Sequence, residues 1–399
     1  MQGYGKIGTE VATDSYYKKR KTISILLISY IYMPYFWNIC EYSFGLPTVM
    51  EYLAYLLLAV VPIFIYPKIK QSVLILIGCF AIILAINYAV VSYRYYVFVE
   101  GVQALIGVTV PCICITNRYF KINDFLKRWY KFAIHNVPLV IVAILLFRMN
   151  LVHYSIFTSI CVPNVFIISY GIMEMKANKK SAIVISVLNI IATVALGGRI
   201  AAVVCITMLV LAYLFSRDIS FIKKLIFIIL LLIVAFLLIE NLNSILAWLS
   251  QQLNSVGIKS RSITLLIEQL NSHELYTTNR DKIYSLTIEY IKDRSALPGG
   301  FGVALNLTSG EYYYVHNLFL QLLVVFGGIG TVIIIGTMVM IFYKLKYKIP
   351  KSAYRLLTFM LLAYLIIGFI GSSFFVHYLA TIFIALFFFG ETVLLEMEV

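Results

Sequence analysis

Charged residues are scarce in this chain of 399 residues: Asp, Glu, Lys and Arg make up 13% of it, about half the share that soluble domains carry. Apolar residues make up 62%, and the mean hydropathy is +0.93. This composition excludes a soluble globular enzyme, a disordered tail, a collagen and a disulfide scaffold. The protein is therefore expected to have lipid as its main solvent.

The usual signatures of nucleotide and metal enzymes are also missing. The chain has no G-x-x-x-x-G-K-[ST] loop for ATP, no H-E-x-x-H, no Cys/His cluster for zinc and no G-x-S-x-G elbow. Its six cysteines lie in or at the ends of apolar stretches and are interpreted as free thiols packed as small hydrophobes. The sequence thus predicts neither a metal nor another cofactor.

Long apolar runs dominate what is present, and a run of about 20 residues is enough to cross a bilayer as a helix. The predicted fold class is an all-α polytopic membrane protein with about 12 transmembrane helices. The predicted spans are roughly 22–40, 48–66, 71–90, 96–116, 132–148, 152–174, 181–197, 200–216, 222–240, 314–342, 353–371 and 374–394. The last pair is divided only by Gly371, Ser372 and Ser373.

Lys and Arg are distributed unevenly between the loops of this topology. With the N-terminus in the cytoplasm, 23 of the 32 fall in cytoplasmic segments and nine in outer ones, although the outer segments include the longest loop. The positive-inside rule therefore predicts that both termini are cytoplasmic. We therefore attribute the net charge of +14 to loops on the cytoplasmic side that lie against anionic lipid headgroups. A nucleic acid is not predicted as a partner.

The chain is predicted to have three parts. Residues 1–240 hold spans 1–9, residues 241–313 form an outer loop, and residues 314–399 hold spans 10–12. A structured loop of this length in a compact protein is usually functional.

Two helices are expected in the outer loop. The stretch 262–270 is apolar enough to lie on a membrane surface. The stretch 278–294 has amphipathic spacing, and Thr278 with Asp281 fits a capping box at its start. A breaker cluster that begins at Pro298 and includes Gly299, Gly300 and Gly302 then ends helical structure.

Three arginines on the outer side are candidates for binding a diphosphate. Arg199 follows two glycines that allow close approach of a ligand. Arg280 opens the predicted loop helix, where unpaired N–H groups and the helix dipole favour anions, and Arg294 lies about four turns later on nearly the same face. The alternatives are an arginine that extends to lipid headgroups at position 199 and solvated charges at the other two.

A histidine at the outer mouth of the tenth span is the candidate base. A neutral imidazole at His316 could take a proton from a hydroxyl group. Tyr312, Tyr313 and Tyr314 precede it and are candidate glycan contacts because sugar rings stack on aromatic faces. Asn317, which follows it, is a further candidate glycan contact. The alternative is an interfacial histidine within a tyrosine belt.

The order of these features resembles the O-antigen polymerase and O-antigen ligase superfamily of bacterial membrane glycosyltransferases. A glycine-preceded Arg199 opens a span, a long outer loop follows with Arg280 at a helix start and a Pro-Gly-Gly-x-Gly cluster, and His316-Asn317 leads into a glycine-containing span. In one departure, Gly198 stands where the superfamily usually has Ser or Thr before the first arginine.

The resemblance implies a fold similar to the GT-C type and an undecaprenyl-diphosphate-linked oligosaccharide as donor, used at the outer face of the bacterial cytoplasmic (inner) membrane. Arginines such as Arg199 and Arg280 would hold the diphosphate, and His316 would lie near the acceptor hydroxyl. The transfer would be metal-independent and inverting. Membrane lipid, a chain-length regulator and a flippase are the implied partners.

Polymerase activity is favoured over two alternatives. An O-antigen ligase would transfer the glycan to lipid A core instead of to a new repeat unit. A lipid-linked oligosaccharide flippase is a different class and would need cations along a cavity through the membrane. The spans carry few acidic residues near their centres, which argues against an ion-driven transporter.

Overall fold

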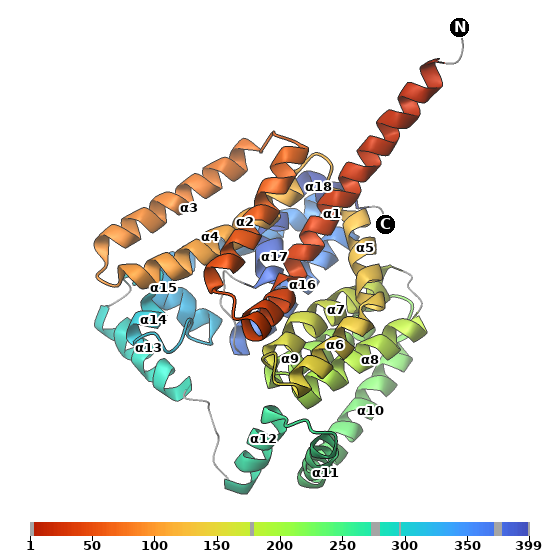
Figure 1. Cartoon of the computed structure of the whole chain (residues 1–399), viewed down its shortest axis with the longest axis vertical. Coiled ribbons are helices and arrows are strands. Elements are labelled where there is room, and N and C mark those ends of the chain that lie inside the picture. The colour runs from red at the N-terminus through yellow and green to blue at the C-terminus, as the bar shows by residue number, and fades with distance from the viewer. Residues whose placement is uncertain (1–3, 176–178, 273–279, 295–296, 371–376, 398–399) are drawn as a thin grey trace. The chain divides into compact units, whose positions relative to one another are not determined.

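The computed structural model describes the whole chain except residues 1–3, 176–178, 273–279, 295–296, 371–376 and 398–399. Every regular element within the described residues is a helix (Figure 1), which confirms the all-α class. Two predicted features lie outside the described residues: the break at 371–373 and the capping residue Thr278.

The helices up to the end of the ninth predicted span are α1 (Tyr4–Phe44), α2 (Thr48–Ile65), α3 (Gln71–Val90), α4 (Arg94–Thr116), α5 (Ile122–His135), α6 (Val137–Arg148), α7 (Ser155–Glu174), α8 (Lys179–Leu196), α9 (Arg199–Phe215) and α10 (Phe221–Glu240). The later helices are α11 (Leu242–Ser255), α12 (Arg261–Ser272), α13 (Arg280–Arg294), α14 (Val303–Leu307), α15 (Leu318–Lys348), α16 (Lys351–Ile370), α17 (Tyr378–Phe389) and α18 (Glu391–Leu395).

The twelve predicted spans all fall on these helices, and the fifth falls on two, α5 and α6. Within the described residues, seven are long and apolar enough to cross a membrane, and the bent pair α5 and α6 brings the number to as many as eight. The other four predicted spans fall on the shorter apolar helices α2, α8, α9 and α17. The protein is a multi-pass membrane protein, and a total of twelve crossings stays a prediction.

The fifth predicted span, 132–148, is divided between two helices. α5 begins ten residues earlier, at Ile122, and ends at His135, and α6 starts after Asn136 with Pro138 in its first turn. Proline has no N–H, and its ring disfavours helical backbone in the residue before it. The chain therefore bends by 49° at this point.

Contacts between helices divide the chain into two compact units. The first comprises residues 1–31, 48–128 and 279–399. Its centre is α4, which packs against α2, α3, α14 and α17. Over 23 residues, α4 is about 33 Å long, close to the roughly 30 Å of a bilayer's hydrocarbon core.

The two ends of α4 have different surroundings. Beyond its last residue, Lys121 pairs with Glu396 from the C-terminal segment, and Arg20 pairs with Asp124. Before its first residue, the hydroxyl of Tyr93 donates to the carbonyl of Gly299 in the predicted outer loop. The ion pairs and the contact with the predicted outer loop thus lie beyond opposite ends of α4.

The second unit comprises residues 32–47 and 129–278, and α7 forms its core with α6, α8 and α9 packed around it. Asn164, buried in α7, joins these helices through its amide. The amide oxygen accepts from Tyr32 at 2.7 Å and Asn136 at 2.8 Å, and the amide nitrogen donates to Asn136 and Asn189 at 2.9 Å each. Because lipid offers no hydrogen-bond partners, these polar groups must form their hydrogen bonds within the protein.

Substitution of Asn164 tests whether this network stabilises the second unit. We expect Asn164→Ala to lower the free energy of unfolding by about 2 kcal/mol, because four polar groups on three buried side chains lose a partner. Asn241→Ala removes one exposed bond to Leu237 and is expected to cost less than about 0.5 kcal/mol. Denaturant titration of both purified variants in detergent compares them, and equal stabilities would contradict the prediction.

Candidate functional site

The site lies where the segment from Pro298 to Gly302 passes between α4 and α15. The N–H groups of Gly299 and Gly300 donate to the carbonyls of Val324 and Val325 at 2.9 Å each. Those carbonyls belong to α15, just before Gly327 leaves helical geometry with φ 69° and ψ 177°. The kink in α15 and the extended segment therefore fit one another.

Glycine is required in this segment by both backbone conformation and space. Gly300 and Gly302 have φ values of 82° and 78°, in the left-handed region that other residues seldom adopt. A Cβ atom on Gly302 would lie 2.5 Å from the carbonyl carbon of Tyr96 and 2.6 Å from the nitrogen of Val97. Both are backbone atoms of α4, so no side-chain movement could make room.

A matched pair of glycine substitutions tests this close approach. We expect Gly302→Ala to abolish the protein's activity and to lower its stability by more than about 1 kcal/mol, the cost of the backbone strain alone. Gly336, in α15, has open space around its Cβ position, so Gly336→Ala is expected to stabilise the helix by up to about 1 kcal/mol. The thermal unfolding midpoint in detergent distinguishes the two variants, and a Gly302→Ala protein as stable as wild type would contradict the close-packing argument.

His316 occupies a strained turn just before α15. Its φ is 59°, a conformation that costs a non-glycine residue about 1 kcal/mol or more. The hydroxyl of Tyr284 donates to its carbonyl at 3.2 Å, and the next residue, Asn317, caps α15 by accepting from Phe319 and Leu320 at 3.0 and 3.2 Å. The backbone on both sides of the imidazole is therefore fixed.

The imidazole lies in an aromatic environment. Its ring centroid is 4.3 Å from that of Tyr314 and 5.9 Å from that of Tyr312. Its Nδ1 atom is buried and has no hydrogen-bond partner among the described residues. A buried polar atom without a partner in a strained turn is typical of a functional group.

Burial, with a smaller contribution from the positive charge of Arg280, lowers the pKa of His316 to about 4. The imidazole is therefore neutral at pH 7 and can accept a proton. Arg280 is thus close enough to the imidazole for its charge to affect the pKa of His316.

Arg280 is the first residue of α13 and is partly buried. The ion pairs found among the described residues do not include it. Ile283 and Thr287, both buried, hold α13 against α14 and α15. A guanidinium group at a helix start, beside free N–H groups, is suited to an anion such as a phosphate.

Two predicted site residues are not brought to this group. Arg294 is the last residue of α13, about 21 Å along the helix from Arg280, and its guanidinium group lies over the ring of Tyr290. Tyr313 is 58% exposed and makes none of the ring contacts that its two neighbours make with His316. The amide oxygen of Asn317 is occupied by the helix cap.

Arg199 belongs to the second unit, where it begins α9. Its guanidinium group donates to Gln269 of α12 at 2.7 Å, and Ser262 of α12 donates to the carbonyl of Gly197. A Cβ atom on Gly197 would lie 2.9 Å from the carbonyl oxygen of Thr193. The glycines before Arg199 thus allow a tight hairpin between α8 and α9 that α12 contacts.

Residues 181–335 match the protein family described as O-antigen ligase. The matched stretch, the family domain of this chain, makes up less than half of its length. The match confirms the resemblance to the polymerase and ligase superfamily, whose members catalyse glycosyl transfer. All predicted site residues, from Arg199 to Asn317, lie inside this domain. Among curated proteins, none matches the chain.

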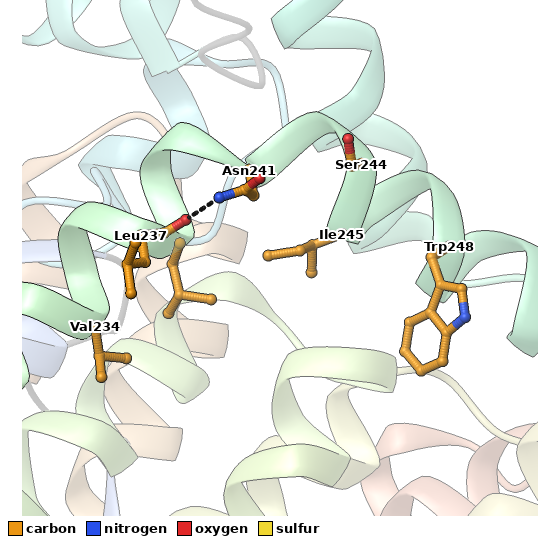
Figure 2. A pocket seen from close by; sticks show the side chains of 7 residues that line it. Val234, Leu237, Asn241, Ser244, Ile245 and Trp248 are labelled. Carbon is orange, nitrogen blue, oxygen red and sulfur yellow. Dashed lines mark hydrogen bonds between the residues drawn. The ribbon is translucent and has the colours of Figure 1, made fainter.

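An apolar groove in the family domain lies apart from these residues. It forms where α10 meets α11 and is lined by Val234, Leu237, Leu238, Asn241, Ser244, Ile245 and Trp248 (Figure 2). The apolar side chains of α10 are exposed along its length, and Trp248 is 57% exposed. An exposed apolar helix that ends near a tryptophan is typical of a helix facing lipid at the membrane interface.

Three residues that are connected to the His316 turn by hydrogen bonds were not among the predicted site residues: Tyr284, Gln321 and Glu100. The first two lie in the family domain and Glu100 lies outside it, in α4. Glu100 was detectable as a lone carboxylate within an apolar run, since an ionisable residue at such a position is usually functional or paired. Gln321 had no such signal, because its role depends on partners distant in the sequence.

Proposed function

We propose that the protein is an O-antigen polymerase. It joins undecaprenyl-diphosphate-linked repeat units at the outer face of the bacterial cytoplasmic membrane. The observation that carries the proposal is the neutral, buried imidazole of His316, with Nδ1 unpartnered, two tyrosine rings beside it and the charge of Arg280 nearby. The family domain supports a lipid-linked sugar as donor.

His316 serves as the base in this proposal. The acceptor hydroxyl attacks the anomeric carbon of the donor sugar while His316 takes the hydroxyl proton. The bond between that carbon and the diphosphate oxygen breaks, and undecaprenyl diphosphate leaves with the electron pair. A single displacement of this kind inverts the anomeric configuration.

Arg280 stabilises the leaving group. A diphosphate gains negative charge as the glycosidic bond breaks, and a fixed cation in a partly dry site favours that change. Arg280 supplies this charge at the start of α13, in place of a metal ion. Arg199 stays a predicted diphosphate contact, and Arg294, about 21 Å from Arg280 along α13, is not assigned to the same diphosphate. The bound diphosphate also offsets the charge of Arg280, so the pKa of His316 rises when the donor binds.

The acceptor glycan contacts the aromatic residues beside His316. Tyr312 and Tyr314 present their rings there, and the exposed Tyr313 and the amide nitrogen of Asn317 offer additional contacts. The two termini are cytoplasmic, and a flippase and a chain-length regulator act with the enzyme in the same membrane.

The second candidate is an O-antigen ligase, because the matching family bears that description and its superfamily includes both activities. The bond broken and the roles of His316 and Arg280 are the same, but the acceptor is lipid A core. A flippase is less well supported, because Arg280 and His316 lie at the end of the first unit that holds the loop, not along a path through the unit.

A complementation experiment tests the proposal. In a strain that lacks the gene, surface polysaccharide is separated on a gel after rescue with wild type, His316→Ala or Arg280→Ala. We expect lipid A core with one repeat unit in the deletion strain and in both variants, and a full ladder with wild type. His135→Ala and Arg217→Ala, at exposed positions, serve as controls and are expected to restore the ladder.

Other outcomes separate the alternatives. Core without any repeat unit indicates a ligase, and a precursor retained on the inner leaflet indicates a flippase. A normal ladder from His316→Ala in a properly inserted protein would overturn the assignment of the base.

The pH dependence of the rate tests the state of His316. Because its pKa is about 4 in the free enzyme, we expect kcat/KM at about pH 5.5 to stay close to its value at pH 7, whereas a histidine of ordinary pKa would keep only about a tenth. The acid limb of kcat is expected at higher pH than that of kcat/KM, since bound diphosphate offsets Arg280. Initial rates in proteoliposomes measure both, and a kcat/KM that halves near pH 6.5 would contradict a buried base.

A further inference from the structure

Glu100 is a buried carboxylate that joins three parts of the first unit. It lies about two turns into α4 with 3% of its surface exposed. One carboxylate oxygen accepts from the backbone N–H of Gly302. The other accepts from the side-chain amide of Gln321, in α15, at 3.1 Å. A charge buried in a membrane protein is costly, and its retention points to a function.

Gln321 extends this connection to the turn that holds His316. Its amide oxygen accepts from the backbone N–H of Val315 at 2.8 Å. Because a carboxylate can only accept, the amide nitrogen of Gln321 faces Glu100 and its oxygen faces Val315. A continuous series of hydrogen bonds therefore leads from Glu100 through Gln321 to the residue before His316.

The turn needs such support because its backbone is strained. With φ at 59°, His316 stays in the left-handed region only where its surroundings hold it there. Tyr284 fixes the carbonyl side of His316. On the other side, Val315 is fully buried and its N–H bonds to Gln321.

We propose that Glu100 is a positioning residue for His316, acting through Gln321. It does not contact the substrate. It fixes the orientation of the Gln321 amide and, through Gly302, holds the glycine segment against α4, so that the imidazole stays between its tyrosines and close to Arg280. This inference rests on the proposed role of His316 as the base.

Exchange of the two side chains tests the inference. In Glu100→Gln, an amide faces the amide of Gln321, and one of the three hydrogen bonds is lost whichever way the amides turn. In Gln321→Glu, two carboxylates meet. In the double variant Glu100→Gln/Gln321→Glu, the new carboxylate accepts from Val315 and from the new amide, whose oxygen accepts from Gly302. All three hydrogen bonds are thus restored with the positions reversed.

We expect each single variant to lower kcat by about tenfold to a hundredfold, the effect of a reacting group misplaced by about 1 Å. The double variant is expected to recover to within about threefold of wild type. KM for the lipid-linked donor is expected to change little, since Arg280 is untouched, and the acid limb of kcat/KM is expected to move to higher pH in the single variants.

Glu240→Gln, exposed at the end of α10, is the matched control and is expected to match wild type.

Two results would overturn the inference: wild-type kcat in Glu100→Gln, or a folded double variant no more active than the single variants. If a single variant fails to insert, the double variant alone decides. An active His316→Ala protein would instead refute the proposed function. An inactive His316→Ala protein together with a fully active Glu100→Gln protein would refute only the positioning role.

Discussion

The close approach of the Pro298–Gly302 segment to α4 and α15 is the constraint on which the candidate site depends. The segment donates to carbonyls of α15 near its kink, and Gly302 lies against the backbone of α4. This packing leaves no space for a side chain at Gly302, and it brings the outer loop into contact with the buried carboxylate of Glu100. This segment of the predicted loop is thereby part of the core of the first unit, where it can hold a reacting group in place.

The electrostatics of His316 follow from the same packing. Burial disfavours the charged imidazole, and Arg280 disfavours it further. Such a histidine is neutral at pH 7 but is a weak base before substrate binds. A diphosphate that offsets Arg280 would make the histidine more basic when the donor is in place, which couples the proposed proton transfer to binding of the correct ligand.

Much of the helical framework could be predicted, because in lipid the backbone must satisfy its own hydrogen bonds and hydropathy therefore marks the helices. The helix boundaries differ from the predicted spans where a proline or a helix-capping residue ends or starts a helix within an apolar run. Pro138 divides the fifth predicted span into α5 and α6, and Asn317 delays the start of α15 to Leu318. Arg280 and His316 could each be named as candidates, since a helix start that favours anions and a histidine beside a span are both visible in the sequence. Their proximity could not be predicted, because they lie 36 residues apart in the chain.

The sequence by itself determined the all-α class, the positions of the apolar helices and the break in helical structure at Pro298–Gly302, because these depend on local composition and spacing. It named His316 and Arg280 as candidates, and their roles stay a proposal. Only the tertiary structure decided that the guanidinium group of Arg294 lies over the ring of Tyr290. Only the tertiary structure placed Glu100 beside Gln321, 221 residues away. Such partners depend on how helices pack, and an amide or carboxylate carries no mark in the sequence of the group that it will meet.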